Sequence, residues 1–260
     1  MKRDLAIAAL AVSFVGAGCA APRDPELERG VLKAKLAKAE TPDDDDKGSE
    51  APPGPASAEA ATAARPVKSY SGSEISGILA AVGGAGKDLV AEIQSTQGAI
   101  RCTLDERAPQ SVANFVALAT GQVEWQAQGR AKSKAPLYDG LTFHRAVQDF
   151  IIQTGNPSGR FNDGPGWRIT RETAANDLFE APGALAMIED GDQAHGSQVF
   201  ITARRDPKLG TKYAAFGRCE PLTVVQAIAN AEKKPVSGDG SPSVPLNPVG
   251  ITSVRVVRAN

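Results

Sequence analysis

The sequence holds few of the side chains that enzymes commonly use as nucleophiles, bases or metal ligands. Its 260 residues include only two histidines and three cysteines. It contains no Cys-x-x-Cys pair, no His-Glu-x-x-His motif and no Gly-x-x-x-x-Gly-Lys-Ser/Thr phosphate-binding loop. Ser197, in Gly196-Ser197-Gln198, lacks the second glycine of a nucleophile elbow, so a serine hydrolase is poorly supported. We expect neither a bound metal nor an organic cofactor.

An excess of positive charge is also absent. The chain has 29 Lys and Arg residues against 30 Asp and Glu residues, which gives a formal net charge of -1. Proteins that bind nucleic acid by displacing counterions from its phosphates carry clustered basic residues. We therefore expect no nucleic-acid partner.

The first nineteen residues have the pattern of an export signal. Lys2 and Arg3 precede an apolar run over residues 5–15, which is too short to span a bilayer as a helix. Small residues then lead to Cys19, which resembles the acylated cysteine of bacterial lipoproteins, although Gly16 stands where those signals usually have an aliphatic residue. We predict a signal peptide over residues 1–19, with Cys19 lipidated as the first mature residue; cleavage without lipidation is the alternative. The protein is then exported to the periplasm or envelope, and the lipid on Cys19 is its only membrane contact.

Residues 20–86 differ in composition from the rest of the chain. They are rich in Ala, Pro, Glu, Asp and Ser, and they contain too little apolar surface to offset the entropy of ordering the chain. We predict a flexible linker, with one short amphipathic helix near residues 73–82, where Ile75, Ile78 and Leu79 recur at helical spacing. The predicted domain comprises residues 87–260, and we expect it to be a monomer.

This domain is predicted to consist mainly of short strands. Residues 89–93 and 99–104 have strand patterns and flank a turn at Gln97-Gly98, as in a hairpin. One helix is expected from Pro109 to about Gly121 and another over residues 222–231. Between them short apolar runs alternate with glycine-rich turns, and a last strand is expected at the C-terminus. The pattern indicates a mainly β fold in which an antiparallel sheet closes into a barrel capped by two helices, because closure removes exposed edges.

Cys102 and Cys219 both lie in the predicted domain. An exported protein occupies a compartment where disulfides persist, so the two could pair. Cys102 also lies in an alternating strand pattern, and Cys219 comes just after Phe216-Gly217-Arg218, so each is compatible with a small buried hydrophobic residue. Because the sequence gives no distance between them, the disulfide stays open, and two buried thiols are the favoured interpretation.

Neither histidine is given a chemical role. Strand alternation points His144 away from its neighbour Arg145, and we interpret His144 as a structural residue. His195 is predicted to be a solvent-facing loop residue.

Residues 143–157, FHRAVQDFIIQTGNP, interleave one cation and several amides with apolar residues. Strand alternation can bring Arg145 and Gln153 to the same surface as Phe150, which would place hydrogen-bond donors beside an apolar platform. Taken singly, Phe150 is more often a core residue and Arg145 a surface charge. Only their combined spacing favours a site.

That spacing resembles the cyclophilins, in which Phe-His-Arg is followed by Phe-x-x-Gln-x-Gly-Asp. Residues 183–187 and 196–201 are similar to the family's Gly-x-Leu-x-Met and Gly-Ser-Gln-Phe-Phe-Ile, and Phe216-Gly217 is similar to its later Phe-Gly. The resemblance covers about residues 89–257, roughly two thirds of the chain. It implies a closed eight-stranded antiparallel barrel capped by two helices, and peptidyl-prolyl cis/trans isomerase activity that needs no cofactor.

The resemblance also implies a set of site residues. It assigns a catalytic role to Arg145, Phe150 and Gln153. It assigns substrate binding to Ile151, Ile188, Glu189, Gln198, Phe200, Leu209 and Tyr213. The implied partners are proline-containing peptides and unfolded exported proteins. A peptide-binding or scaffold module at the envelope, with incidental catalysis, is the alternative, and Arg145 favours the enzyme because a module that only binds peptides needs no cation at the prolyl nitrogen.

Overall fold

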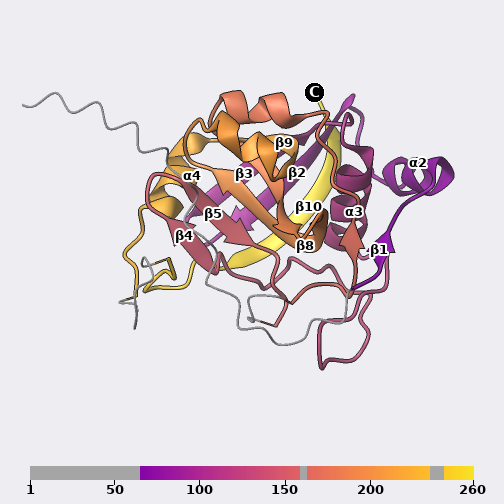
Figure 1. The fold of residues 1–260 in the computed structure, drawn as a ribbon, viewed down its shortest axis with the longest axis horizontal. Helices are drawn as coiled ribbons and strands as arrows, with labels where there is room; N and C mark the ends of the chain where they lie inside the picture. The colour runs from indigo at the N-terminus through magenta and orange to yellow at the C-terminus, as the bar shows by residue number, and fades with distance from the viewer. Residues whose placement is uncertain (1–64, 159–162, 235–242) are drawn as a thin grey trace, which may run out of the picture. The chain divides into compact units, whose positions relative to one another are not determined.

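The computed structural model describes residues 65–158, 163–234 and 243–260 (Figure 1). The predicted signal peptide, Cys19 and the linker up to residue 64 lie outside these described residues.

Ten strands in the described ranges belong to one sheet. They are β1 (Val67–Lys68), β2 (Asp88–Ser95), β3 (Gly98–Leu104), β4 (Arg145–Val147), β5 (Ile151–Thr154), β6 (Arg168–Ile169), β7 (Ala184–Asp190), β8 (Gln193–Thr202), β9 (Ala214–Glu220) and β10 (Ile251–Ala259). The strand order is β1-β6-β8-β7-β9-β3-β2-β10, while β5 joins β8 and carries β4. All pairs are antiparallel except that of β1 with β6.

The fold is therefore mainly β, as predicted, but the closed eight-stranded barrel is wrong. The sheet has ten strands, and within the described residues its end strands β1 and β10 do not pair with each other. Residues 65–86, which we call the arm, account for one of the additional strands. The arm adds β1 to one end of the strand order, and beyond α2 its residues 83 and 84 bond to Arg258 of β10 at the other end. Gly84 is required there, because its φ is +120° and a Cβ would lie 2.2 Å from the carbonyl oxygen of Arg258.

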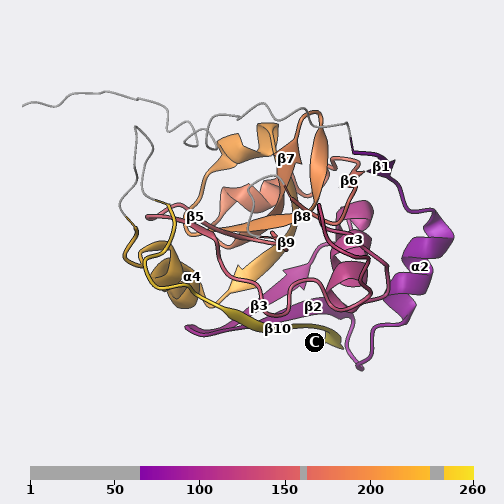
Figure 2. The ribbon, with the colours of Figure 1, turned by 90° about the horizontal axis from the view of Figure 1, so that it is seen from below.

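The helices lie at both ends of the sheet. Figures 1 and 2 show α4 (Leu222–Ala229) at one end, and α3 (Pro109–Ala119) at the other with α2 (Gly72–Ala80) outside it. The two helices predicted for the domain are thus confirmed. Every residue of α3 from 111 to 119 is buried, although the pattern predicted one apolar face, because α2 covers its outer side. No helix in the described ranges has the length and apolarity needed to cross a membrane.

The arm is ordered, although its composition led us to group it with the flexible linker. The predicted helix is present as α2, and it begins with a capping box in which the Ser71 hydroxyl accepts from the Glu74 backbone N–H. The Glu74 carboxylate accepts from the Ser71 backbone N–H at 2.7 Å. Tyr70 and Val82 are buried against the domain. Burial of these two side chains supplies apolar contact between the arm and the domain.

The buried residues form two clusters on opposite sides of β7. Leu185 and Met187 point into the main core, which also holds Phe115, Phe143 and Phe216. The intervening Ala184 and Ala186 point to a smaller cluster, whose other members are Phe150, Ile151, Phe179, Phe200, Leu209 and Ala215. This alternation is the ordinary period of a strand with both faces covered. The candidate site lies on the side of the smaller cluster.

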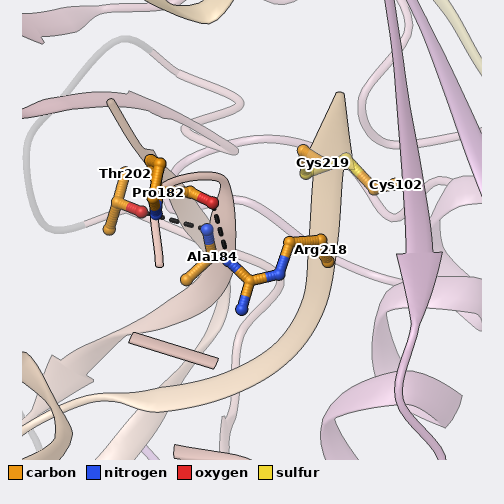
Figure 3. Close-up of a disulfide and its surroundings, with 6 residues drawn as sticks. All are labelled: Cys102, Pro182, Ala184, Thr202, Arg218 and Cys219. Carbon is orange, nitrogen blue, oxygen red and sulfur yellow. Dashed lines mark hydrogen bonds between the residues drawn. A yellow bond between two sulfur atoms is a disulfide. The ribbon is translucent and has the colours of Figure 1, made fainter. Parts of the chain in front are cut away.

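Cys102 and Cys219 form a disulfide between β3 and β9 (Figure 3). The strand register places them directly opposite each other, with Cα atoms 3.9 Å apart although 117 residues separate them in the chain. Both are buried. The interpretation as two buried thiols is therefore wrong, because it rested on each cysteine's local pattern and not on the pairing of the strands.

Candidate active site

One row of side chains crosses the sheet on the side of the smaller cluster. The register pairs Arg145 of β4 with Gln153 of β5, and Gln153 with Phe200 of β8. Phe200 pairs in turn with Ala186 of β7, and Ala186 with Ala215 of β9. Directly paired residues on neighbouring strands have Cβ atoms about 5 Å apart on one face of the sheet. The row therefore places a cation, an amide and an aromatic ring side by side, followed by two alanines that fill little space.

A hollow lies over this row. Its lining comes from strands β4, β5, β7 and β8, from the short helix η2 (Pro207–Thr211), and from the residues beside them. The ring of Tyr213 meets that of Phe200 edge-on, with centroids 4.9 Å apart. The residues that line it are Arg145, Phe150, Ile151, Ile188, Phe200, Leu209 and Tyr213. Seven of the residues that the resemblance implied are thus brought together, and all except Arg145 and the Tyr213 hydroxyl present apolar surface.

Gln153 and Gln198 form a hydrogen-bonded chain that starts at Arg145. The Arg145 Nη1 donates to Gln153 Oε1 at 3.4 Å, and Gln153 Nε2 donates to Gln198 Oε1 at 2.8 Å. Gln198 Nε2 then donates to the carbonyl oxygen of Asp163 at 3.1 Å. A guanidinium can only donate and a carbonyl can only accept, so the two ends fix the orientation of both amides. Both glutamines are buried, and the chain holds Arg145 at the side of the hollow.

The remaining predicted residues lie elsewhere. Glu189 is exposed and does not line the hollow, but it lies close enough for its charge to act on Tyr213. Burial, with a smaller contribution from Glu189, raises the pKa of the Tyr213 hydroxyl. Burial also lowers the pKa of Arg145, which stays protonated at neutral pH because an arginine in a protein does not lose its proton. Cys19 lies outside the described residues.

Sequence reasoning missed two residues that support the wall of the hollow. The guanidinium of Arg204 lies 4.7 Å from the centroid of the Phe150 ring, which is the geometry of a cation–π contact. Phe179 stacks against Phe200 with centroids 6.2 Å apart. Both belong to segments outside the motifs, so no local pattern could have indicated them. Among the described residues no group of three or more His, Cys, Asp or Glu side chains is placed to hold a metal ion.

Comparison with known proteins identifies the family. A family model described as cyclophilin type peptidyl-prolyl cis-trans isomerase matches residues 90–256, more than half of the chain. The chain is a cyclophilin. Peptidyl-prolyl cis-trans isomerase A of Mycobacterium tuberculosis is 36% identical over 171 residues, which are 64% of this chain and 91% of that protein. Peptidyl-prolyl cis-trans isomerase B of Streptomyces anulatus is 37% identical over 175 residues, 65% of this chain and 97% of that protein.

A solved structure agrees with the fold. The crystal structure of a Cryptosporidium parvum cyclophilin type peptidyl-prolyl cis-trans isomerase has a TM-score of 0.55 and 21% sequence identity, and the match covers 67% of this chain and all of that one. The family and the names of the relatives show that this cyclophilin is a peptidyl-prolyl cis-trans isomerase.

Both histidines of the cyclophilin are held neutral by burial. His195 is 3% exposed on β8, and its Nδ1 accepts from the backbone N–H groups of Ser197 and Gln198 at 3.1 and 3.0 Å. The prediction of a solvent-facing loop residue is wrong, because β6 and the arm cover this part of β8. Burial, then the charge of Arg65, lowers the pKa of His195 to about 3. Burial and the charge of the neighbouring arginine lower the pKa of His144 to about 4.

These depressed pKa values predict how the stability of the cyclophilin depends on pH. The unfolded chain takes up a proton on each histidine below pH 6.5, whereas the folded chain does so only near pH 3 to 4, so stability falls as the pH is lowered from 6.5. His195→Asn removes one titrating group but keeps an acceptor, Asn Oδ1, near the position of Nδ1. Between pH 6.5 and pH 5, we expect the free energy of unfolding of this variant to fall by about 2 kcal/mol less than that of the native chain. Urea unfolding at the two pH values measures this, and equal losses would contradict it.

Proposed function

We propose that Arg145 carries the isomerisation. The barrier to rotation about an X-Pro bond, about 18–20 kcal/mol, comes mainly from amide resonance. Twisting the bond breaks that resonance and leaves a lone pair on the prolyl nitrogen. A fixed guanidinium that donates to this lone pair stabilises the twisted state more than either planar state, and that difference is catalysis.

In this proposal the hollow holds the proline ring. Phe150, Phe200 and Leu209 would bury the ring, while Gln153 and Gln198 would bind the flanking peptide and orient Arg145. The related Cryptosporidium parvum structure determined in the presence of the dipeptide Ala-Pro supports a proline-containing peptide as substrate. We propose that the enzyme acts as a monomer.

The observation that carries the proposal is the position of Arg145 at the side of an apolar hollow, held by a buried amide. A module that only binds proline needs the hollow but no cation fixed beside it. The isomerisation rate of an Arg145→Ala variant tests the proposal.

We further propose that the enzyme acts on unfolded exported proteins, anchored at the cell envelope by a lipid on Cys19. The signal pattern of residues 1–19 motivates this, and the buried Cys102–Cys219 disulfide supports it, because disulfides persist in exported proteins and are rare in the cytosol.

Metabolic labelling tests the anchor. In a bacterial host that expresses the full chain, we expect radiolabelled palmitate to enter the native protein and not the Cys19→Ala variant. A native protein that reaches the periplasm without label would contradict lipidation and favour simple cleavage of the signal. Retention of the native protein in the cytosol would contradict export itself.

A further inference from the structure

The arm precedes residue 90, where the match to the family model begins, so membership of the family explains nothing about it. Its first residues nevertheless lie against the part of β8 that carries Gln198. We propose that Arg65 and Tyr70 are positioning residues of the isomerase site. They hold residues 195–198, which we call the bulge, in the conformation that places the Gln198 amide beside Gln153. The inference rests on the role proposed above for Gln198.

The bulge is a place where β7 does not fix the backbone of β8, although His195 still pairs with Arg168 of β6. The pairing of β7 with β8 passes from Met187 opposite Val199 to Glu189 opposite Ala194, so residues 195–198 have no ladder partner on β7. The His195 ring replaces part of that ladder, because its Nδ1 accepts the two backbone N–H groups at positions 197 and 198. This works only while the ring is neutral, since a protonated Nδ1 is a donor.

Arg65 clamps this arrangement from outside. Its Nη2 donates to Asp190 Oδ2 of β7 at 2.7 Å, and its Nη1 lies 3.3 Å from His195 Nε2 of β8. One side chain of the arm is therefore bonded to β7 through Asp190 and packed against His195 of β8, close to the point where the ladder between the two strands is interrupted. Because Nδ1 accepts two N–H groups, the single proton of the neutral ring is on Nε2, so the approach of Arg65 to His195 is a packing contact and not a hydrogen bond. The positive charge beside the ring opposes the uptake of a second proton. The Arg65 carbonyl is itself held, because it accepts from the Nε of Arg168 on β6.

Tyr70 reaches the bulge by a second route. Its hydroxyl donates to Asn114 Oδ1 at 3.3 Å, and the buried Asn114 Nδ2 donates to the carbonyl oxygen of Gly196 at 2.7 Å. The backbone of Tyr70 is fixed on α3 by Gln110, whose amide accepts from the Tyr70 N–H and donates to the Tyr70 carbonyl. Two arm residues thus converge on one segment of four residues.

The Arg65/Asp190 ion pair also lies close to the hollow. Along β7, Ala184, Ala186 and Ile188 belong to or pack on the smaller cluster, and Asp190 is the next residue at the same spacing. The Arg65/Asp190 ion pair therefore lies beyond Ile188 along β7, while Gln198 lies at the end of the bulge. A displaced bulge would change the position of Gln198 more directly than that of Arg145, so the effect is expected on peptide binding.

Four variants of the full chain test the inference. Arg65→Gln removes the charge and keeps most of the length, Arg65→Lys keeps the charge, and Tyr70→Phe removes one hydroxyl. The control is Arg255→Ala, an exposed arginine on β10 at the other end of the strand order. We expect Arg65→Gln to raise KM for a proline-containing peptide about tenfold with little change in kcat, because small displacements of a binding group are costly. We expect Arg65→Lys to recover part of this, Tyr70→Phe to raise KM about threefold, and Arg255→Ala to leave both constants unchanged.

A folded Arg65→Gln variant with native KM would overturn the proposal. If that variant does not fold, a native KM in Tyr70→Phe overturns it. A rise in KM that is equally large in Arg65→Gln and Arg65→Lys would show that Arg65 has a structural role alone, and this would overturn the proposal. A lower kcat with native KM would do the same. An Arg145→Ala variant measured in parallel separates failure of the proposed function from failure of the inference about the arm. If Arg145→Ala keeps the native rate, the proposed function of the site fails, whatever the arm variants show.

Discussion

Arg145→Ala is expected to lower kcat/KM for isomerisation of an Ala-Pro peptide by about 100- to 1000-fold, mainly through kcat. This is the range found when one pre-organised donor to a transition state is removed from an enzyme. The hollow itself is unchanged, since Phe150, Phe200 and Leu209 remain, so the proline ring still binds and KM changes little. A protease-coupled or NMR exchange assay on the full chain measures both constants.

Two further variants decide what the loss means. Arg145→Lys keeps the positive charge but not the planar fork of donors that reaches both Gln153 and the hollow, so it should recover only a small part of the rate. Arg205→Ala is the matched control, because Arg205 is an exposed arginine paired with Glu180 outside the hollow. We expect the native rate for this control. A native rate for Arg145→Ala would leave the hollow as a binding site without the proposed chemistry.

Much of the site could be predicted because its residues lie close together in the sequence. Residues 143–157 place Arg145 and Gln153 on two adjacent strands, β4 and β5, and Phe150 in the short turn that joins them. In such a hairpin the pairing is local, and the alternation of side chains then determines which of them share a face. The residues from β8 and η2 were found only through the resemblance to a family, because no local rule connects them to that hairpin.

The errors share one physical cause, the pairing of segments far apart in the chain. The cysteine pair depends on the register of β3 against β9, and a shift of one residue would have turned one thiol to the other face. The burial of His195 depends on β6 and on the arm, which lies 130 residues earlier at Arg65. The arm itself is ordered by contacts with α3 and β10, and its own composition gives no sign of them.

Reduction of the Cys102–Cys219 disulfide is expected to lower the free energy of unfolding by about 2–5 kcal/mol. The bond joins residues 117 positions apart, so it removes a large loop-closure entropy from the unfolded chain, and a loop of about 100 residues corresponds to about 4.7 kcal/mol. Urea unfolding with and without dithiothreitol compares the two states of one sequence. A Cys102→Ala/Cys219→Ala double variant is the control, because its unfolding should not respond to the reductant. Equal midpoints for oxidised and reduced native chain would contradict the prediction.

The folded protein should nevertheless keep its isomerisation rate when reduced. Both cysteines belong to the main core, on the side of the sheet away from the smaller cluster that surrounds the hollow. Next to the disulfide, hydrogen bonds hold β9 against the residues just before β7 independently of the sulfur atoms. Arg218 Nη1 donates to the carbonyl oxygen of Pro182 at 2.6 Å (Figure 3). It also donates to the carbonyl oxygen of Ala181 at 3.0 Å. The bond therefore acts mainly on the unfolded chain, and its loss should shorten the lifetime of the enzyme without altering catalysis by each folded molecule. A reduced, folded chain with a lower kcat would show instead that β9 transmits strain to Tyr213 and the hollow.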